Sequence, residues 1–288
     1  DISFCPEDYL QLDTLAKENN VTVIPDAGVA PGLCNVILGY HNSRMTVESY
    51  KCMVGGLPMK REWPLEYKAS WSPRDVIEEY TRPARFIRNG KLVTMEALSE
   101  SETTSFKRAG ELEAWNSDGL RSLLSTMKHV PNMVEKTMRY PGTTEYLRVL
   151  RHLGFFSDTE LHVSGRGIKP VDLTAALLFP QWQLQEGEKE FTAMRITIKG
   201  KEKGEEMAHE YELYDEYDER SATTSMARTT GYTCAAVAGM LIEGLFSRKG
   251  ICPPEYIGEE ENGLQFIFNY LKQRHIEIKH ESYRIACQ

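Results

Sequence analysis

The first forty residues combine helical patterns of apolar positions with one short β-branched run. A helix is predicted from Pro6 to about Glu18, with an apolar side made of Leu10, Leu12, Leu15 and Ala16. Val21–Ile24 predicts a strand, and Asp1–Phe4 is typical of the end of another. Strands joined by a helix are typical of a parallel sheet, which must be covered on both faces. We therefore expect the chain to start inside a domain whose first part precedes it; the alternative is a complete small sheet.

From residue 47 the apolar positions follow the two-residue period of antiparallel strands. Strands are predicted at Val47–Val54, Leu65–Trp71, Arg85–Arg88, Lys91–Met95, Val134–Tyr140, Phe191–Lys199 and Met207–Tyr217. Between two of them, Asn89-Gly90 is typical of a two-residue hairpin turn. Helices are predicted at Gly32–Tyr40, Pro73–Arg82, Leu120–Lys128, Thr143–Leu153, Pro170–Phe179 and Thr224–Phe246. Their caps would be Ser72 and Asp118 at two N-termini and Gly154 at one C-terminus.

Composition and charge narrow the class of protein. The formal net charge of -8 gives no global attraction to nucleic acid or to an anionic membrane. The longest apolar stretch, Ala235–Phe246, is short and interrupted, so it does not predict a membrane span. The six cysteines are scattered without CxxC spacing, and we expect reduced thiols in a cytoplasmic protein.

Known catalytic motifs predict no reaction for this sequence. The GxGxxG fingerprint fails everywhere, and Gly165–Pro170 lacks its third glycine. Walker and GxSxG motifs are absent, and the seven histidines have no HxxxH or HExxH spacing that would support a metal site. The segment Asp26–Gly32 follows a predicted strand, where open parallel sheets bind ligands. Its residues fit a ligand-binding loop and an ordinary strand-to-helix turn about equally well.

Several blocks of the sequence occur together and in order. They are IPDAGVAPGLCNVILGY, VGGLP, PLEYKASWSPRDVIEEYTRPARFIRNGK, LEAWNSDG, KTMRYPG and TSMARTTGYTCAAVAGMLIEG, and they reach from about Asp1 to about Gly250. The set resembles the saccharopine dehydrogenase family, and in particular its short members such as lysine 6-dehydrogenases. The resemblance implies a Rossmann domain that binds NAD or NADP, joined to an α+β domain.

Under this resemblance the fold class is α/β plus α+β, with the C-terminal remnant of a Rossmann domain joined to a mostly antiparallel sheet. The implied domains are residues 1–34 for the remnant, 35–222 for the substrate-binding and dimerisation domain, and 223–288 for the returning helix and tail. The family fingerprint would lie upstream of this chain. A homodimer and a small amino-acid substrate are also implied, without nucleic acid or membrane partners.

The resemblance also implies roles for individual residues. Cofactor contacts would come from Asp26, Gly28, Ala30, Pro31, Gly32, Thr229 and Thr230. Substrate contacts would come from Arg139, Arg228, Glu66 and Tyr67. Arginine suits a substrate carboxylate, but Arg139 could equally pair with a neighbouring acid. In a strand Glu66 and Tyr67 would face opposite sides, so we expect only one of them in the site. No general base can be named.

Two functional hypotheses follow. The first is an NAD(P)-dependent oxidoreductase that oxidises a C–N bond of saccharopine or lysine, with hydride transfer to the nicotinamide and hydrolysis of the imine. The second is a catalytically silent substrate-binding or dimerisation domain, because this chain contains no glycine-rich phosphate loop.

Overall fold

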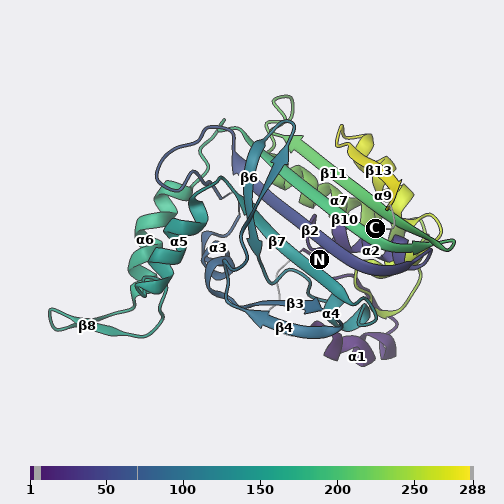
Figure 1. The fold of residues 1–288 in the computed structure, drawn as a ribbon, viewed down its shortest axis with the longest axis horizontal. Coiled ribbons are helices and arrows are strands. Elements are labelled where there is room, and N and C mark those ends of the chain that lie inside the picture. Colours follow the sequence, from purple (N-terminus) through teal and green to yellow (C-terminus); the bar gives the residue numbers. More distant parts are fainter. Residues whose placement is uncertain (3–7, 70, 286–288) are drawn as a thin grey trace.

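A nine-stranded sheet forms the centre of the computed structural model, which describes residues 1–2, 8–69 and 71–285 (Figure 1). Its main path runs β13-β11-β10-β2-β7-β3-β4, and β6 and β5 branch from β7. The bounds are β2 (Thr46–Pro58), β3 (Ala84–Arg88), β4 (Lys91–Met95), β5 (Glu102–Phe106), β6 (Gly110–Asn116), β7 (Asn132–Arg139), β10 (Glu190–Glu202), β11 (Glu205–Glu216) and β13 (Ile278–Arg284). Among these strands only β2 and β7 pair in parallel, which confirms a mostly antiparallel sheet in a mixed α and β fold.

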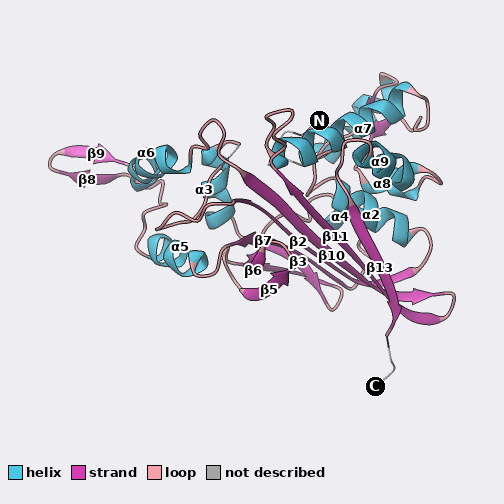
Figure 2. Cartoon of the chain, turned by 90° about the horizontal axis from the view of Figure 1, so that it is seen from above, coloured by secondary structure: helices cyan, strands magenta, loops and turns pink. Residues whose placement is uncertain are grey.

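A layer of helices lies on one face of the sheet (Figure 2). It consists of α2 (Leu33–Asn42), α7 (Ser225–Ile242), α8 (Glu255–Glu259) and α9 (Gly263–Lys272). Ile37 of α2, Ile196 of β10 and Ile267 of α9 are fully buried in the apolar core between the layers. Burial of such a side chain stabilises the fold by roughly 1.5–3 kcal/mol. The predicted helices Gly32–Tyr40 and Thr224–Phe246 are therefore confirmed, although α7 ends earlier than expected.

A second apolar core lies at the other end of the molecule, under α3 (Pro73–Thr81), α5 (Thr143–His152) and α6 (Pro170–Trp182). Its largest buried side chains are Tyr80, Trp115 and Trp182. The hairpin of β8 (Leu161–Val163) and β9 (Arg166–Ile168) projects away from this end as an arm (Figure 1). Trp115 is thus a packing residue, as its aromatic contacts indicate.

The N-terminal segment is tied to the end of the chain. After the short 3-10 helix at Tyr9–Leu12, α1 (Asp13–Glu18) leads to β1 (Thr22–Val23). β1 pairs in parallel with β12 (Gly250–Ile251), so the predicted parallel pairing is present, although with a strand from far along the chain. The predicted apolar helix side is wrong, because Leu12 and Leu15 are more than half exposed. The expected strand at Asp1–Phe4 and the start of the helix at Pro6 lie largely outside the described residues.

Two further predictions are wrong. Leu65–Trp71 is not a strand: Glu66 has a positive φ of 49°, and its described residues contain only an isolated bridge, from Ala69 to Gln183. A residue in this left-handed conformation turns the chain and cannot continue a pleated strand. Asp118 does not cap a helix, because its carboxylate binds the side chain and backbone N–H of Arg85. The helix there is the short α4 (Leu123–Thr126), which begins after Ser122.

The hairpin turn and the glycine at the end of α5 agree with the structure, whereas Ser72 precedes α3 as predicted but its side chain makes no capping hydrogen bond. The β3–β4 hairpin closes at Asn89 and Gly90, which both have the positive φ that a type I′ turn requires. Gly154 follows α5 with a φ of 84°, as expected for a glycine that ends a helix. No helix in the described part of the chain combines the length and apolarity that crossing a membrane requires.

Candidate functional site

The Asp26–Gly32 segment forms a tight loop at the start of α2. The N–H of Leu33 donates to the carbonyl of Gly28 at 2.9 Å, and the N–H of Cys34 donates to that of Val29 at 3.2 Å. The N–H of Gly32 donates to the Asn35 side chain at 3.1 Å. These donors would otherwise bind an anion at the helix N-terminus. The loop therefore satisfies its own backbone groups and is not a phosphate cradle.

Asp26 is held by groups of the same chain. Its carboxylate accepts a hydrogen bond from the Tyr9 hydroxyl at 2.7 Å. It also forms an ion pair with Arg121, whose Nε lies 3.2 Å away. The side chains of Asp26 and Arg121 are 2% and 5% exposed. This buried network fixes the loop, so Asp26 has a positioning role in the described structure.

The exposed part of the loop lies beside α7. Val29, Ala30 and Pro31 are only partly buried. The methyl group of Thr230 lies 3.3 Å from the position that a Cβ would take at Gly28. Thr229 instead is buried, and its hydroxyl donates to the carbonyl of Ser225 at 2.9 Å. Of the two predicted threonines, only Thr230 is therefore placed beside the loop.

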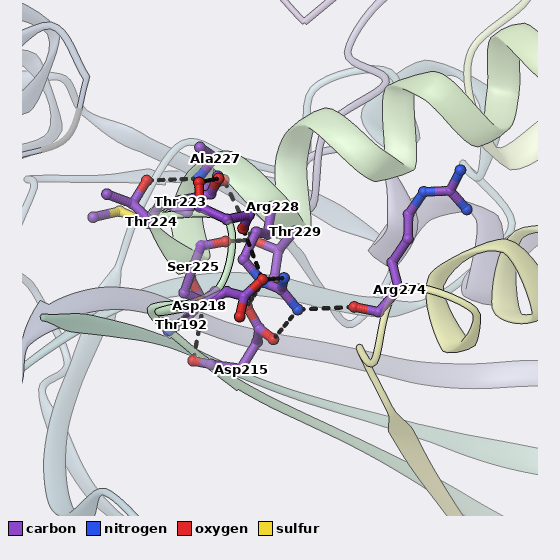
Figure 3. Close-up of polar contacts among 12 residues, drawn as sticks. Thr192, Asp215, Asp218, Thr223, Thr224, Ser225, Ala227, Arg228, Thr229 and Arg274 are labelled. Atoms are coloured by element: carbon purple, nitrogen blue, oxygen red, sulfur yellow. Dashed lines mark hydrogen bonds and ion pairs between the residues drawn. The ribbon is translucent and has the colours of Figure 1, made fainter.

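Arg228 points to the other side of α7, toward the sheet (Figure 3). Its Nε lies 3.0 Å from the carboxylate of Asp215, and its Nη1 lies 3.1 Å from that of Asp218. Its Nη2 donates to the carbonyl of Arg274 at 2.9 Å. These partners and the burial of Arg228, which is 5% exposed, make it a link between α7, β11 and the end of α9.

Glu190 is a buried acid that the sequence interpretation missed. One carboxylate oxygen accepts the Met226 N–H at 3.1 Å at the start of α7, and the other has no hydrogen-bond partner among the described residues. Burial raises the pKa of Glu190 to about 7, with a further contribution from the charge of Asp215 and opposed by hydrogen bonds from the helix N-terminus. Its position as the first residue of β10 gave no local signal, since charged residues commonly begin strands.

Glu190→Gln is expected to make stability less dependent on pH. The pKa of Glu190 is higher in the folded state than in the unfolded chain, so its contribution to the free energy of unfolding is full below pH 4.5. That contribution is lost as pH rises through about 7, because the folded state then holds a buried charge. At pH 8 the variant should be more stable than the parent by up to about 3 kcal/mol, and at pH 4.5 the two should be equal. Urea unfolding at a series of pH values measures this difference. The exposed Glu186→Gln variant is the control, and a parallel shift in both variants would contradict the assignment.

Arg139 is buried at the end of β7 and fully engaged. It is 3% exposed, and its guanidinium lies 2.7 Å from the carboxylate of Glu79. The same group stacks 4.1 Å above the Tyr67 ring and donates to the Tyr80 hydroxyl at 3.4 Å. Of the two alternatives, pairing with an acid is what the structure contains, with a buried arginine and a half-buried glutamate.

Glu66 and Tyr67 line one hollow of about 170 Å³. Its other lining residues include Lys60, Lys68 and Trp182. The strand that was expected to separate the two side chains is absent, because Glu66 has a positive φ. Both residues line the hollow, although Tyr67 is more deeply buried than Glu66. Tyr67 also contacts Arg139, so the hollow and the guanidinium are separated by one ring.

The parallel pairing of β2 and β7 brings these features to one end of the sheet. It places the end of β2, which leads to the hollow, and Arg139 at the end of β7 on the same edge. The first turn of α7 closes over that edge, since Met226 leaves no room for a side chain at Gly56 of β2. The predicted residues thus form two groups, one around the 28–32 loop and one around the hollow. Arg228 belongs to neither group.

Comparison with known proteins identifies the family. The family model described as saccharopine dehydrogenase C-terminal domain matches residues 28–276. The chain belongs to the saccharopine dehydrogenase family. This family member is 27% identical over 172 residues to saccharopine dehydrogenase (NADP(+), L-glutamate-forming) of Pyricularia oryzae, covering 55% of this chain and 38% of that relative. The corresponding enzyme of Schizosaccharomyces pombe is 22% identical, with 85% of this chain and 70% of the relative covered.

Solved structures agree with this saccharopine dehydrogenase fold. Apo saccharopine dehydrogenase (L-Glu forming) from Saccharomyces cerevisiae superposes with a TM-score of 0.76 at 18% identity, covering 98% of this chain and 78% of that one. Homospermidine synthase from Legionella pneumophila, in complex with NAD, gives a TM-score of 0.59 at 11% identity, covering 98% and 68%. The chain spans 38% of the length of the Pyricularia oryzae relative and 17% of alpha-aminoadipic semialdehyde synthase of Arabidopsis thaliana.

Proposed function

We propose that this chain is the substrate-binding part of an NAD(P)-dependent oxidoreductase that oxidises the C–N bond of saccharopine. The match of the family model to residues 28–276 is the observation that carries the proposal. In this reaction a hydride passes from carbon to the nicotinamide and the amine becomes an imine. Water then adds to the imine carbon, and the C–N bond breaks. Lysine remains the alternative substrate, but the glutamate-forming enzymes among the relatives favour saccharopine.

We infer a division of labour within the longer protein. Residues 1–34 would belong to the Rossmann domain, 35–222 to the substrate-binding domain, and 223–288 to the segment that returns to the Rossmann domain. The parallel pairing of β1 with β12 supports this return, because it joins the first segment to the last. The packing of Gly28 against Thr230 gives a second contact of the same kind.

The cofactor contact expected of this chain is with the nicotinamide end. Ala30, Pro31 and Thr230 offer small, partly exposed groups that suit one face of a flat ring. Gly28 and Gly32 would allow the close backbone packing beneath this surface. Asp26 and Thr229 would fix the loop and helix that carry it through their hydrogen bonds. The diphosphate fits none of these groups, since the N–H groups at the start of α2 are already used. NAD and NADP are both compatible with this assignment.

The substrate is expected beside the hollow at the end of β2. Saccharopine carries a glutamate arm, and its carboxylates would compete with Glu62 for the ammonium groups of Lys60 and Lys68, which line the hollow. The hollow of about 170 Å³ is below the usual size of a whole ligand pocket, so it would take one arm only. Glu66 and Tyr67 would bind or orient the amine at its mouth. Arg139 would support Tyr67 and, if Glu79 moved, anchor a carboxylate directly.

Arg139→Ala in the full-length protein is expected to raise KM for the amino acid by about 10- to 100-fold, roughly the worth of one charged hydrogen bond. KM for the nucleotide should change much less, because the residue lies on the substrate side of α7. Arg139→Lys separates charge from geometry, and circular dichroism checks that each variant folds. The exposed Arg85→Ala variant is the control. Equal changes in both KM values would remove the substrate role.

The decisive test of the proposed function is NAD(P)H formation by the full-length protein with saccharopine, and separately with lysine. NAD(P)H formation with either substrate supports the proposed oxidoreductase activity, and the substrate that reacts identifies which dehydrogenase it is. A folded full-length preparation that binds neither nucleotide would overturn the proposal and favour the silent binding domain. The 288-residue chain itself is expected to give no turnover, because it has no phosphate loop of its own.

A homodimer in the cytoplasm is the assembly that we propose. The projecting end of the molecule supports it, because α5, α6 and the β8–β9 arm carry exposed apolar side chains. These are Tyr146, Val149, Leu153, Leu161, Val163, Leu173 and Leu177. Exposed apolar side chains gathered at one end of a molecule are typical of a protein interface. Sedimentation equilibrium of the full-length protein tests the assembly, and a monomer at micromolar concentration would contradict it.

A further inference from the structure

Three histidines meet on the helical face of the sheet, far from the substrate end. His41 lies in α2, His209 in β11 and His280 in β13. One ring nitrogen of each lies within 4.8 Å of the others. The lack of a local histidine motif gave no indication of a metal site, because the three residues are separated by 168 and 71 positions. The fold alone brings them together.

The strand register explains why they converge. β11 and β13 pair antiparallel with Tyr211 opposite His280, so these two side chains share one face of the sheet. Their rings stack with centroids 4.2 Å apart. His209 lies two residues from Tyr211 and therefore faces the same side. The side chain of His41 projects from α2 toward this face of the sheet, and its ring centroid lies 4.1 Å from that of His209.

The hydrogen bonds define which nitrogen is available on His209. Its Nε2 lies 3.2 Å from the carboxylate of Glu202, which can only accept, so Nε2 carries the proton. Nδ1 then presents its lone pair toward Nε2 of His280 at 3.1 Å. A carboxylate behind a histidine in this way is the usual outer support of a metal ligand.

Two of the three histidines are buried and one is open to solvent. Nε2 of His41 lies 2.8 Å from the Tyr211 hydroxyl, so this nitrogen already has a hydrogen-bond partner. His41 and His209 are 4% and 6% exposed, whereas His280 is exposed and gives an ion a route from solvent.

We propose that His41, His209 and His280 bind one divalent transition-metal ion of the Zn²⁺ class, with Glu202 as the supporting carboxylate. Zinc–nitrogen bonds of about 2.1 Å place ligand atoms roughly 3.4 Å apart, so each ring need move by less than about 1 Å. Water would complete the coordination on the exposed side of His280. The ion would fasten the edge strand β13 and helix α2 to β11. Its role would be structural, since Asp215, near the end of β11 covered by the start of α7, lies roughly 20 Å further along the strand.

Titration of tag-free protein, stripped with EDTA, with Co²⁺ and then Zn²⁺ tests the site. The parent should bind one equivalent of Co²⁺, with the visible absorption of a four-coordinate ion that Zn²⁺ abolishes, and Zn²⁺ should raise the melting temperature. His280→Ala changes an exposed side chain, so it should fold normally and lose both effects. Glu202→Gln should weaken binding by about 10- to 100-fold.

The matched control is His162→Ala, since His162 is an exposed histidine on the projecting β8–β9 arm. It should bind metal as the parent does. The proposal is overturned if the parent shows no saturable binding of one equivalent. It is also overturned if His280→Ala retains the Co²⁺ spectrum and the thermal shift, because the ion would then be bound elsewhere.

Discussion

Replacing Arg228 with methionine should lower the free energy of unfolding by roughly 3–5 kcal/mol, the usual cost of removing one partner of a buried ion pair. Arg228 is 5% exposed, and it is paired with Asp215, which is 7% exposed. Methionine fills most of the space but leaves the Asp215 charge buried and unpaired. Asp218 and the carbonyl of Arg274 lose a donor in the same step. Urea unfolding followed by circular dichroism measures the loss.

The ion pair of Arg85 and Asp118 provides the matched control. Its arginine side chain is 45% exposed, so Arg85→Met should cost no more than about 1 kcal/mol. Asp215→Asn combined with Arg228→Met should recover part of the stability, because the unpaired charge is then gone. Equal losses for Arg228→Met and Arg85→Met would show that the Arg228 network does not hold α7. Arg228 would then become available again as a direct substrate anchor.

Local patterns predicted most of the fold. The alternation at Phe191–Lys199 and Met207–Tyr217 predicted the β10–β11 pair. β11 alternates from His209 onward, and β10 alternates from Met194 onward, while the first residues of β10 are buried on both faces. Proline at the start of α3 and glycine after α5 marked helix ends for equally local reasons. The failure at Leu65–Trp71 has a local cause as well, because apolar spacing does not register the left-handed conformation of Glu66.

The candidate site was less predictable because its partners come from distant positions. Nothing near Arg139 in the sequence indicates Glu79, and nothing near Arg228 indicates the carbonyl of Arg274. Glu190 is the first residue of a strand and looks solvated until α7 covers it. The three clustered histidines were equally unpredictable, because they come from three distant segments of the sequence. Residue type and order therefore identified the family, but only the packed structure separates positioning residues from those that could face a ligand.

Gly32→Ala is expected to destabilise the fold by about 4 kcal/mol, combining backbone strain with overpacking. Gly32 has φ 136° and ψ -97°, a conformation that is essentially confined to glycine. A Cβ at this position would lie 2.0 Å from the carbonyl oxygen of Gly28, which is backbone and cannot turn aside. That oxygen also accepts the hydrogen bond from Leu33 that closes the loop. Thermal and urea unfolding measure the loss.

A second glycine in the same region gives the opposite expectation. Gly231 lies inside α7 without a positive φ, and outside its chain neighbours and the backbone of α7 no described atom lies within 4 Å of the position of an alanine methyl group there. Gly231→Ala should therefore stabilise the fold by about 0.5–1 kcal/mol. Under the proposed function, Gly32→Ala should also reduce nucleotide binding by the full-length protein, since the loop carries the surface proposed for the nicotinamide. A stable Gly32→Ala variant with unchanged nucleotide affinity would contradict both the strain and the cofactor contact. If stability falls while affinity is retained, the loop is only the strand-to-helix turn that its sequence equally allowed.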